Sequence, residues 1–450
     1  MTQAIQKKLS DSPVARWSVL GIVSVTMLCG YFITDVMAPL QPMLEENFGW
    51  DGAEYGLFTG SYGWFNVMLF MLIIGGIILD KKGMRFTGIL SCVLMLIGCA
   101  VKYYAVSPFF ALEGVFFGMK AQVLTACLGF ATFGVGVEIA GVTVTKVIAR
   151  WFKGKEIALA MGLQVATARI GTALALSLSV RVAKYFGEIS MPVLLGLLLL
   201  CIGWIAFLVF CVMDRKLDAS IGKTDTESED AFRISDIFLI IRNRGFWLIA
   251  VLCVLFYSAV FPFLKFATSL MINKYGVGED LAGSIPSLLP FGTIILTPLF
   301  GNLYDKVGKG AGIMIFGSVL LVVVHTLFAL PVLNVWWFAA IVMIVLGIAF
   351  SLVPSAIWPS VPKIIPQNQL GTAYATIFWV QNIGLSGVPM LIGWVLKTYC
   401  QTGNPDKPYD YTLPMIIFTG FGILAVFVAC LLKREDRKKG YGLENPNRKR

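Results

Sequence analysis

One turn occurs twice in this chain, first as Gly76-Ile77-Ile78-Leu79-Asp80-Lys81-Lys82-Gly83-Met84-Arg85 and again as Gly301-Asn302-Leu303-Tyr304-Asp305-Lys306-Val307-Gly308-Lys309. Both copies share G-x-x-x-D-K-x-G followed by a basic residue, Arg85 two positions after the last Gly in the first copy and Lys309 directly after it in the second, and each follows a long apolar run. In such a turn the Asp can accept backbone N–H groups of the next helix, Gly permits a tight reversal, and the basic residues anchor at anionic headgroups. A single copy is typical of any basic turn between membrane helices, but two copies at matched positions indicate a duplicated membrane protein.

The composition also places the chain in a membrane. Of its 450 residues 57% are hydrophobic and 14% are charged, and the mean hydropathy is +0.80, which is more apolar surface than a soluble core can bury. The apolar runs are much longer than the about ten residues of a barrel strand and do not alternate, so we predict an all-α membrane protein with twelve transmembrane helices. The predicted spans are 17–42, 52–79, 86–106, 122–149, 156–183, 190–213, 244–273, 280–304, 310–331, 334–360, 368–396 and 412–433.

A polar linker divides these spans into two pseudo-symmetric six-helix bundles. The predicted parts are a cytoplasmic N-terminus, a first bundle, a cytoplasmic linker, a second bundle and a basic tail, at 1–16, 17–213, 214–243, 244–433 and 434–450. A second internal correspondence sets Glu156 through Gly171 against Gln369 through Gly384, with the same offset at both ends. This repeat supports a fold built from duplicated halves.

The positive charge is distributed unevenly between the two sides of the predicted membrane. The net charge is +10, and 27 of the 36 Lys and Arg residues lie in the termini and in the loops on their side. This asymmetry predicts that both termini and the 214–243 loop are cytoplasmic, and it argues against nucleic acid as a partner. No acidic dileucine pair is found near the N-terminus, so we expect a bacterial inner membrane, with the lysosomal membrane as the alternative.

Residue clusters typical of enzymes and metal sites are missing from the sequence. We find no buried His-Asp pair, no nucleophile elbow, no phosphate-binding Gly loop and no metal-ligand cluster. Most of the nine cysteines lie inside apolar runs without a repeated Cys-x-x-Cys spacing, as expected of small hydrophobic residues. We therefore expect no catalytic activity, no cofactor and no metal.

Two opposite charges interrupt successive apolar runs, Glu138 in the fourth and Arg169 in the fifth. Glu138 lies about 18 Å before the basic turn that begins at Arg150, and Arg169 lies about 21 Å beyond that turn, so an antiparallel hairpin brings both to the same depth. A charge near the bilayer centre costs roughly 2.5–3.5 kcal/mol, so such residues usually face a partner or a wet cavity. Two interpretations are open: a permanent ion pair between two helices, or two groups that line a substrate cavity.

Other polar and aromatic residues in the spans are candidates for the same cavity. Tyr62 and Asn66 lie one helical turn apart, and Asn382 reaches a similar depth in the second half with Gln381 beside it. Aromatic walls and hydroxyl donors are expected from Tyr257, Trp358 and Tyr374. For each of these residues the alternative is an interhelical hydrogen bond or a position at the headgroups.

Asp35 and Lys265 lie in the outer third of the first and seventh spans. They can pair across the two halves as an outer gate, or each can extend its charged end towards the headgroups. A Lys265 that faces the cavity would favour an acidic end on the substrate.

The repeated turn resembles the signature of the major facilitator superfamily, whose members expose a central cavity to each side of the membrane in turn by rocking two halves. Further stretches are similar to the lysosomal dipeptide transporters of this superfamily. They are Glu138, Trp151-Phe152-Lys153-Gly154-Lys155-Glu156, Gly162-Leu163-Gln164, Ala168-Arg169-Ile170-Gly171, Ala259-Val260-Phe261-Pro262-Phe263, Trp358-Pro359, Gln369-Leu370-Gly371-Thr372-Ala373-Tyr374 and Gln381-Asn382-Ile383-Gly384. Weaker matches at Asp35, Leu40-Gln41, Tyr62, Trp64 and Asn66 extend the resemblance over nearly the whole chain.

This resemblance implies a facilitative carrier of dipeptides or similar small zwitterions, with Glu138 and Arg169 lining its cavity. Residues expected to act in gating or conformational change are Asp35, Asp80, Arg85, Asp305 and Lys309. Many proton-coupled members carry an arginine eight residues before the position of Glu138, where this chain has Phe130, so that route of coupling is disfavoured and coupling stays open.

Two alternatives to a dipeptide carrier remain. The same fold can serve an organic or inorganic anion, attracted by Arg169 and Lys265, or the protein can be a membrane sensor that transports nothing. The expected partners are a small-molecule substrate and the lipid bilayer. The sequence does not determine whether a second copy or an accessory subunit binds.

Overall fold

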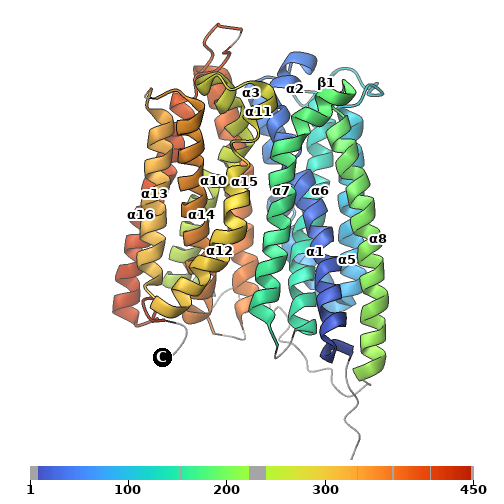
Figure 1. The fold of residues 1–450 in the computed structure, drawn as a ribbon, viewed down its shortest axis with the longest axis vertical. Coiled ribbons are helices and arrows are strands. Elements are labelled where there is room, and N and C mark those ends of the chain that lie inside the picture. The colour runs from blue at the N-terminus through green and yellow to red at the C-terminus, as the bar shows by residue number, and fades with distance from the viewer. Residues whose placement is uncertain are drawn as a thin grey trace, which may run out of the picture.

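The protein is a bundle of long helices that run between two faces (Figure 1). The computed structural model describes residues 9–152, 155–221, 240–331, 333–366, 369–405 and 407–446. Within this part, α1 begins and α16 ends at the lower end of Figure 1, which we call the terminal face; the other end is the opposite face. Parts of the predicted N-terminus, linker and tail, namely 1–8, 222–239 and 447–450, lie outside the described residues.

The helices form two groups that lie side by side in Figure 1. The N-terminal half contains α1 (Pro13–Asp35), α2 (Gln41–Phe48), α3 (Gly52–Gly60), α4 (Trp64–Met68), α5 (Met71–Ala105), α6 (Ala121–Trp151), α7 (Ile157–Phe186) and α8 (Met191–Ile221), with the 3-10 turns η1 (Leu9–Asp11), η2 (Ala38–Leu40) and η3 (Ser61–Gly63). The C-terminal half contains α10 (Arg244–Tyr275), α11 (Glu279–Ala282), α12 (Leu288–Val307), α13 (Gly310–Ala329), α14 (Trp336–Ile364), α15 (Leu370–Tyr399) and α16 (Thr412–Lys439). The strands β1 (Val115–Phe116) and β2 (Met119–Lys120) form a small ribbon at the opposite face.

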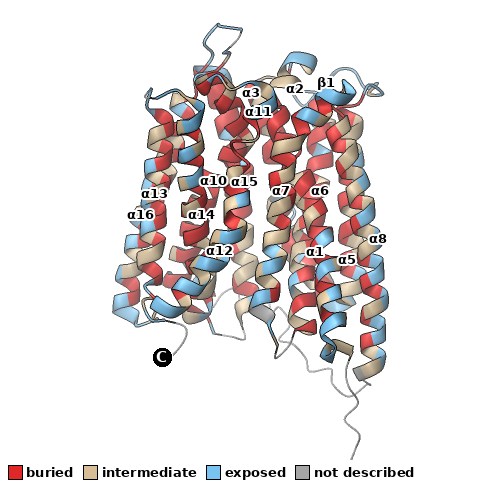
Figure 2. Ribbon diagram, in the orientation of Figure 1, coloured by how far each residue is buried: buried red, intermediate tan, exposed pale blue. Residues whose placement is uncertain are grey.

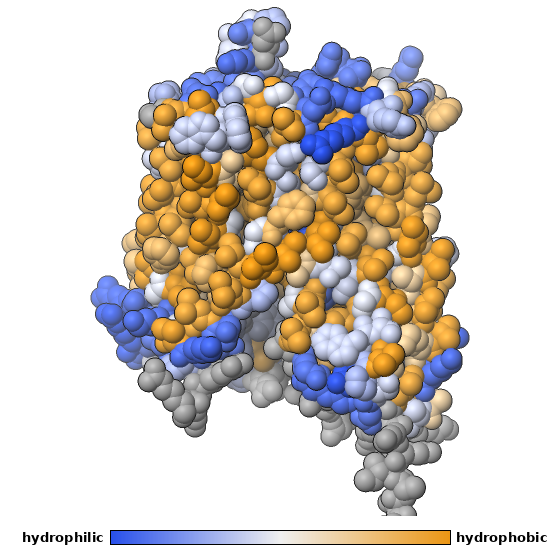
Figure 3. All heavy atoms as spheres, in the orientation of Figure 1, coloured by the Kyte–Doolittle hydropathy of each residue, from blue (hydrophilic) through white to orange (hydrophobic). Residues whose placement is uncertain are grey.

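The outer surface of the bundle is apolar in its middle. Along α8, Leu198, Ile202 and Ile205 are each more than half exposed, at the three- and four-residue spacing of one helix face. Figure 2 shows the buried residues on the inward sides of the helices, and Figure 3 shows an apolar band between two hydrophilic ends. Ten helical stretches of the described residues are long and apolar enough to cross a membrane. The chain is therefore a multi-pass membrane protein, as predicted.

Two of the predicted spans differ from continuous helices. The predicted span 52–79 is divided into α3, η3, α4 and the first part of α5, and Phe70 just before α5 has a φ of 53°. The predicted span 280–304 begins as the short α11 and continues as α12 only from Leu288. The second and third predicted spans meet inside α5 at Gly83, whose φ of 79° is a conformation that favours glycine. The turn of the first repeat is thus a sharp kink between two spans.

Candidate functional site

A cavity of about 580 Å³ lies between the two halves, with walls from α1, α6 and α7 on one side and from α10, α12, α14 and α15 on the other. Of the predicted binding and gating residues it is lined by Asp35, Tyr62, Glu138, Arg169, Tyr257, Lys265, Trp358 and Gln381. Asn66, Tyr374 and Asn382 do not line it. The structure therefore brings most of the predicted polar residues of both halves to one central space.

Glu138 faces this cavity from α6 and accepts a hydrogen bond from the Tyr62 hydroxyl at 2.7 Å. The approach depends on Gly134, because a Cβ there would lie 2.2 Å from the Tyr62 carbonyl oxygen. Asn66 is fully buried and donates to the Gly134 carbonyl at 3.3 Å, so it makes the interhelical hydrogen bond that was its alternative. Tyr62 and Glu138 thus form one polar group on the N-terminal wall, and Asn382 of α15 lies close to the same carboxylate.

Arg169 of α7 has aromatic rings around its guanidinium instead of an acid. Its Cζ lies 5.1 Å from the ring centroids of Phe261 and Phe350 and 5.6 Å from that of Tyr31, a cation–π arrangement that uses rings from both halves. Among the described residues no carboxylate oxygen lies within 4.0 Å of it, and Glu138 is not paired with it. The permanent ion pair between these two residues is therefore absent from this structure.

The C-terminal wall is a chain of aromatic contacts. The Trp358 indole N–H donates to the Tyr257 hydroxyl oxygen at 3.1 Å, so the O–H of Tyr257 stays available as a donor. The Tyr374 hydroxyl, which does not line the cavity, donates to the Trp358 carbonyl at 3.2 Å and so helps to hold Trp358 in place. Asn382 donates to the Phe378 carbonyl at 3.0 Å, within its own helix.

The cavity is closed towards the opposite face by contacts between the halves. Lys265 of α10 pairs with Asp35 of α1 at 2.6 Å and also donates to the Thr34 carbonyl at 2.7 Å, so of the two alternatives the structure has the pairing across the halves. Above it α3 packs on α15: a Cβ at Gly56 would lie 2.6 Å from the Pro389 carbonyl oxygen. We call these contacts the seal.

A second ion pair across the halves joins Asp51, at the N-cap of α3, to Lys397 of α15 at 2.8 Å. Burial favours the neutral carboxyl, but hydrogen bonds from Lys397 and from the N–H groups of Glu54 and Ala53 outweigh it, so the pKa of Asp51 lies below its usual value. Asp51 is therefore charged at neutral pH and adds to the seal.

In the other direction the cavity continues towards the terminal face. Its walls there include Met161 and Gly162 near the start of α7 and Gly301 near the end of α12. The central cavity is thus sealed at one face and extends towards the other.

The sequence matches the profile of the Major Facilitator Superfamily over residues 23–389 and 257–447. The chain belongs to the major facilitator superfamily. The lysosomal dipeptide transporter MFSD1 of Bos taurus is 28% identical over 406 residues, which cover 88% of this chain and 82% of the relative. The MFSD1 of Homo sapiens is 27% identical over 430 residues, which cover 93% and 86%.

Solved structures of this superfamily are similar throughout. The nucleoside transporter NupG aligns with a TM-score of 0.69 at 15% identity, covering 93% of this chain and 99% of that one. The inward-open xylose transporter XylE from E. coli aligns with a TM-score of 0.69 at 14% identity, covering 93% and 96%. These low identities show the fold alone; with the family match, they establish a membrane transporter of the superfamily with the predicted architecture.

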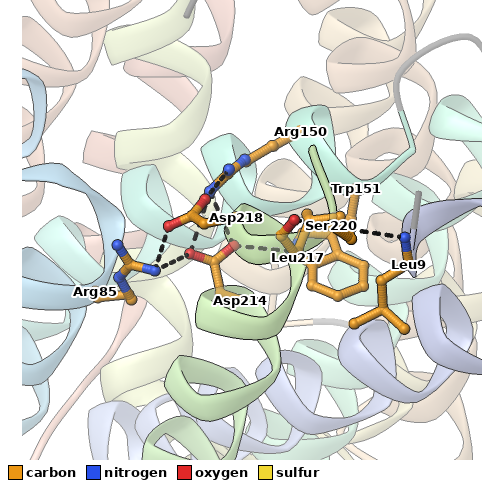
Figure 4. A network of polar contacts seen from close by, with 8 residues as sticks. All are labelled: Leu9, Arg85, Arg150, Trp151, Asp214, Leu217, Asp218 and Ser220. Atoms are coloured by element: carbon orange, nitrogen blue, oxygen red, sulfur yellow. Dashed lines mark hydrogen bonds and ion pairs between the residues drawn. The ribbon is translucent and has the colours of Figure 1, made fainter. Parts of the chain in front are cut away.

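The first repeated turn of this major facilitator protein is held by ion pairs at the terminal face. Asp80 binds the Lys146 ammonium of α6 at 2.9 Å, rather than the backbone N–H groups that we expected. Arg85 pairs with Asp218 at 2.6 Å and with Asp214 at 3.4 Å, and both carboxylates also bind Arg150 (Figure 4). The network joins α5, α6 and α8, so the turn ties three helices of one half together.

The second repeated turn is held differently, by the main chain of the C-terminal segment. Lys309 has a φ of 58° and its N–H donates to the Glu444 carbonyl at 2.9 Å, and the N–H of Gly310 donates to the Leu443 carbonyl at 3.0 Å. Leu443 is fully buried beneath this contact. Asp305 also has a partner within the structure.

Several residues of the site were missing from the sequence prediction. The rings of Tyr31, Phe261 and Phe350 surround Arg169. The sequence could not indicate this role, because aromatic residues are common in apolar runs. Phe261 alone had a signal, because it lies in a stretch that resembles the dipeptide transporters. Lys102, inside the predicted span 86–106, was given no role, and the structure buries it.

Proposed function

We propose that this transporter carries dipeptides or similar small zwitterions through the central cavity by alternating access, without a coupling ion. The observation that supports this best is that Glu138 and Arg169 both line one cavity and are not paired with each other. An acid and a base that are both available in a water-accessible space match the ammonium and the carboxylate of a zwitterion. The relatives named lysosomal dipeptide transporters, at 27–28% identity, support the same substrate class.

The Arg169 side would bind the substrate carboxylate. A guanidinium offers a planar fork to a carboxylate, and rings over its faces leave the edge of the fork free. Tyr257, whose hydroxyl oxygen already accepts the Trp358 N–H, would add an O–H donor to the same carboxylate. On the other wall, Glu138 held by Tyr62 would accept the ammonium.

The arrangement of the halves corresponds to one state of the cycle. With both termini in the cytoplasm, as the distribution of Lys and Arg indicates, the cavity extends inwards and the seal closes the outer side. We propose a bacterial inner membrane as the location. Asp35, Lys265 and the two repeated turns would then control the exchange between this state and an outward-open one.

Uptake by proteoliposomes tests the proposal directly. Arg169→Ala should abolish counterflow of a labelled dipeptide, while Arg215→Ala, which removes an exposed arginine of α8 outside the cavity, should leave it unchanged. Thermal unfolding of both variants checks that the loss is not a folding defect. Full dipeptide uptake by Arg169→Ala would defeat the assignment.

An anion carrier is the second candidate, because Lys265 lines the cavity and Arg169 has no acidic partner within ion-pair distance among the described residues. Competition separates the two. A zwitterion carrier should be inhibited by free dipeptides and much less by the same dipeptides with a blocked amino group, whereas an anion carrier should bind both equally. Imposing a pH gradient in the same vesicles tests the facilitative mode, since coupled uptake would concentrate the substrate.

A further inference from the structure

Lys102 of α5 is a buried cation that the proposed substrate cavity does not use. Only 1% of the residue is exposed, and it does not line the cavity. Its ammonium donates to the Ile33 carbonyl at 2.8 Å. An ammonium has three N–H donors, and no carboxylate of the described residues pairs with this one, although a lone charge inside a membrane protein is costly.

The position of Lys102 is built into the packing of α5 on α6. A Cβ at Gly98 would lie 2.3 Å from the Phe133 nitrogen, and a Cβ at Gly129 would lie 2.7 Å from the Lys102 nitrogen. The two backbones can approach this closely only because both residues are glycines. The crossing places the Lys102 ammonium 4.6 Å from the ring centroid of Phe130.

The same ring has a second lysine near it. The Lys265 ammonium lies 5.9 Å from the Phe130 centroid and is paired with Asp35. The two lysines also bind successive carbonyls at the end of α1, Ile33 for Lys102 and Thr34 for Lys265. Two ammonium groups, one from each half, therefore approach the end of α1, where Asp35 is the carboxylate.

We propose that Lys102 is the counter-ion of Asp35 when the opposite face opens. Asp35 and Lys102 belong to the N-terminal half and Lys265 to the C-terminal half, so opening the seal must separate Asp35 from Lys265. Asp35 is only 5% exposed, and a buried acid that loses its partner is strongly destabilising. Lys102 has unused donors and lies beside the same helix end, so it takes over the carboxylate and the open state does not contain an orphan charge.

In this exchange Lys102 takes part in the transport cycle without contacting the substrate. Removing Lys265 should favour the open state, because Asp35 then has a partner only there. Removing Lys102 should favour the sealed state, because Asp35 then has a partner only with Lys265. The alternative is a purely structural lysine that caps the end of α1, which would act in the same way in both states.

Distances between spin labels across the opposite face measure these populations. Labels at Glu113→Cys and Thr402→Cys lie on exposed loops of the two halves, in a protein with Cys201→Ser and Cys430→Ser, since the other seven cysteines are buried. In a Lys265→Met background, adding Lys102→Met should lower the ratio of open to sealed molecules about tenfold or more. Lys274→Met is the control, because Lys274 also donates to backbone carbonyls near this face but lies in the other half, and it should change the ratio little.

Dependence on Asp35 distinguishes the exchange from simple capping. In a Lys265→Met/Asp35→Asn protein, Lys102→Met should no longer lower the open population; an undiminished effect would show capping and overturn the proposal. No effect of Lys102→Met in the first background would also overturn it. If the Lys102→Met variants do not fold, two other substitutions in the Lys265→Met background decide. Lys102→Arg should leave the ratio of open to sealed molecules unchanged, and Asp35→Asn should lower it. Either opposite result would refute the exchange, whatever the substrate is.

Discussion

Replacing Gly56 by alanine should weaken the seal by about 1 to 3 kcal/mol, the usual cost of overpacking. The new Cβ would lie 2.6 Å from the Pro389 carbonyl oxygen and 2.8 Å from the Gly393 Cα, where ordinary contact begins at 3.4 Å. Both neighbours are backbone atoms and cannot rotate away, so α3 and α15 must separate. Because this contact exists only when the opposite face is closed, the cost falls on the sealed state.

The expected change is a rise of about 5- to 150-fold in the ratio of open to sealed molecules, which corresponds to 1 to 3 kcal/mol. Spin-label distances across the opposite face measure that ratio directly. Gly387→Ala is the matched control, since Gly387 lies on the same helix α15 and a Cβ there would meet nothing within 4 Å. If Gly56→Ala and Gly387→Ala give the same distance distribution, α3 and α15 are not in the tight contact described.

Three further outcomes are expected. Glu138→Gln should weaken uptake of every zwitterion at least about tenfold by loss of ammonium binding; retained uptake with altered pH dependence, measured in proteoliposomes, would instead show a proton site. Asp214→Asn should lower stability by about 1 to 3 kcal/mol in thermal unfolding, because Arg150 and Arg85 lose a buried carboxylate; an unchanged midpoint would contradict this. In the sealed state the pKa of Asp51 lies below its ordinary value. The ion pair between Asp51 and Lys397 is therefore fully present at a pH above the ordinary pKa, and it is lost as the pH falls through the depressed pKa of the sealed state. Acid should thus increase the spin-label distance, and Lys397→Met should remove that response.

The helices of this protein were largely predictable from its apolar runs. The predicted spans 122–149 and 244–273 correspond to α6 and α10 within a few residues. The span 52–79 was wrong as a continuous helix, because its breaks arise where glycines of α3 and η3 meet α15, more than 300 positions later in the chain. An apolar run does not reveal such a distant contact.

The candidate site was predictable only where it departs from its surroundings. Glu138 and Arg169 stand out because a charge is unusual in an apolar run, and both line the cavity. The rings that surround Arg169 resemble every other aromatic residue of the spans, so only the structure shows them. Lys102 was given no role because its burial depends on the close crossing at Gly98 and Gly129, which spacing along one helix does not show.

The two repeated turns, though copies in sequence, have been reinforced by different means. Side-chain ion pairs hold the first. The second is held by main-chain hydrogen bonds from Lys309 and Gly310 to Glu444 and Leu443. The Lys363 ammonium in turn holds that C-terminal segment by donating to the Gly442 and Asn445 carbonyls. Trimming the chain after Lys439 would therefore strip the support from one copy only. For expression work, an affinity tag at this end needs a spacer beyond Pro446, so that purification does not disturb one half of the carrier.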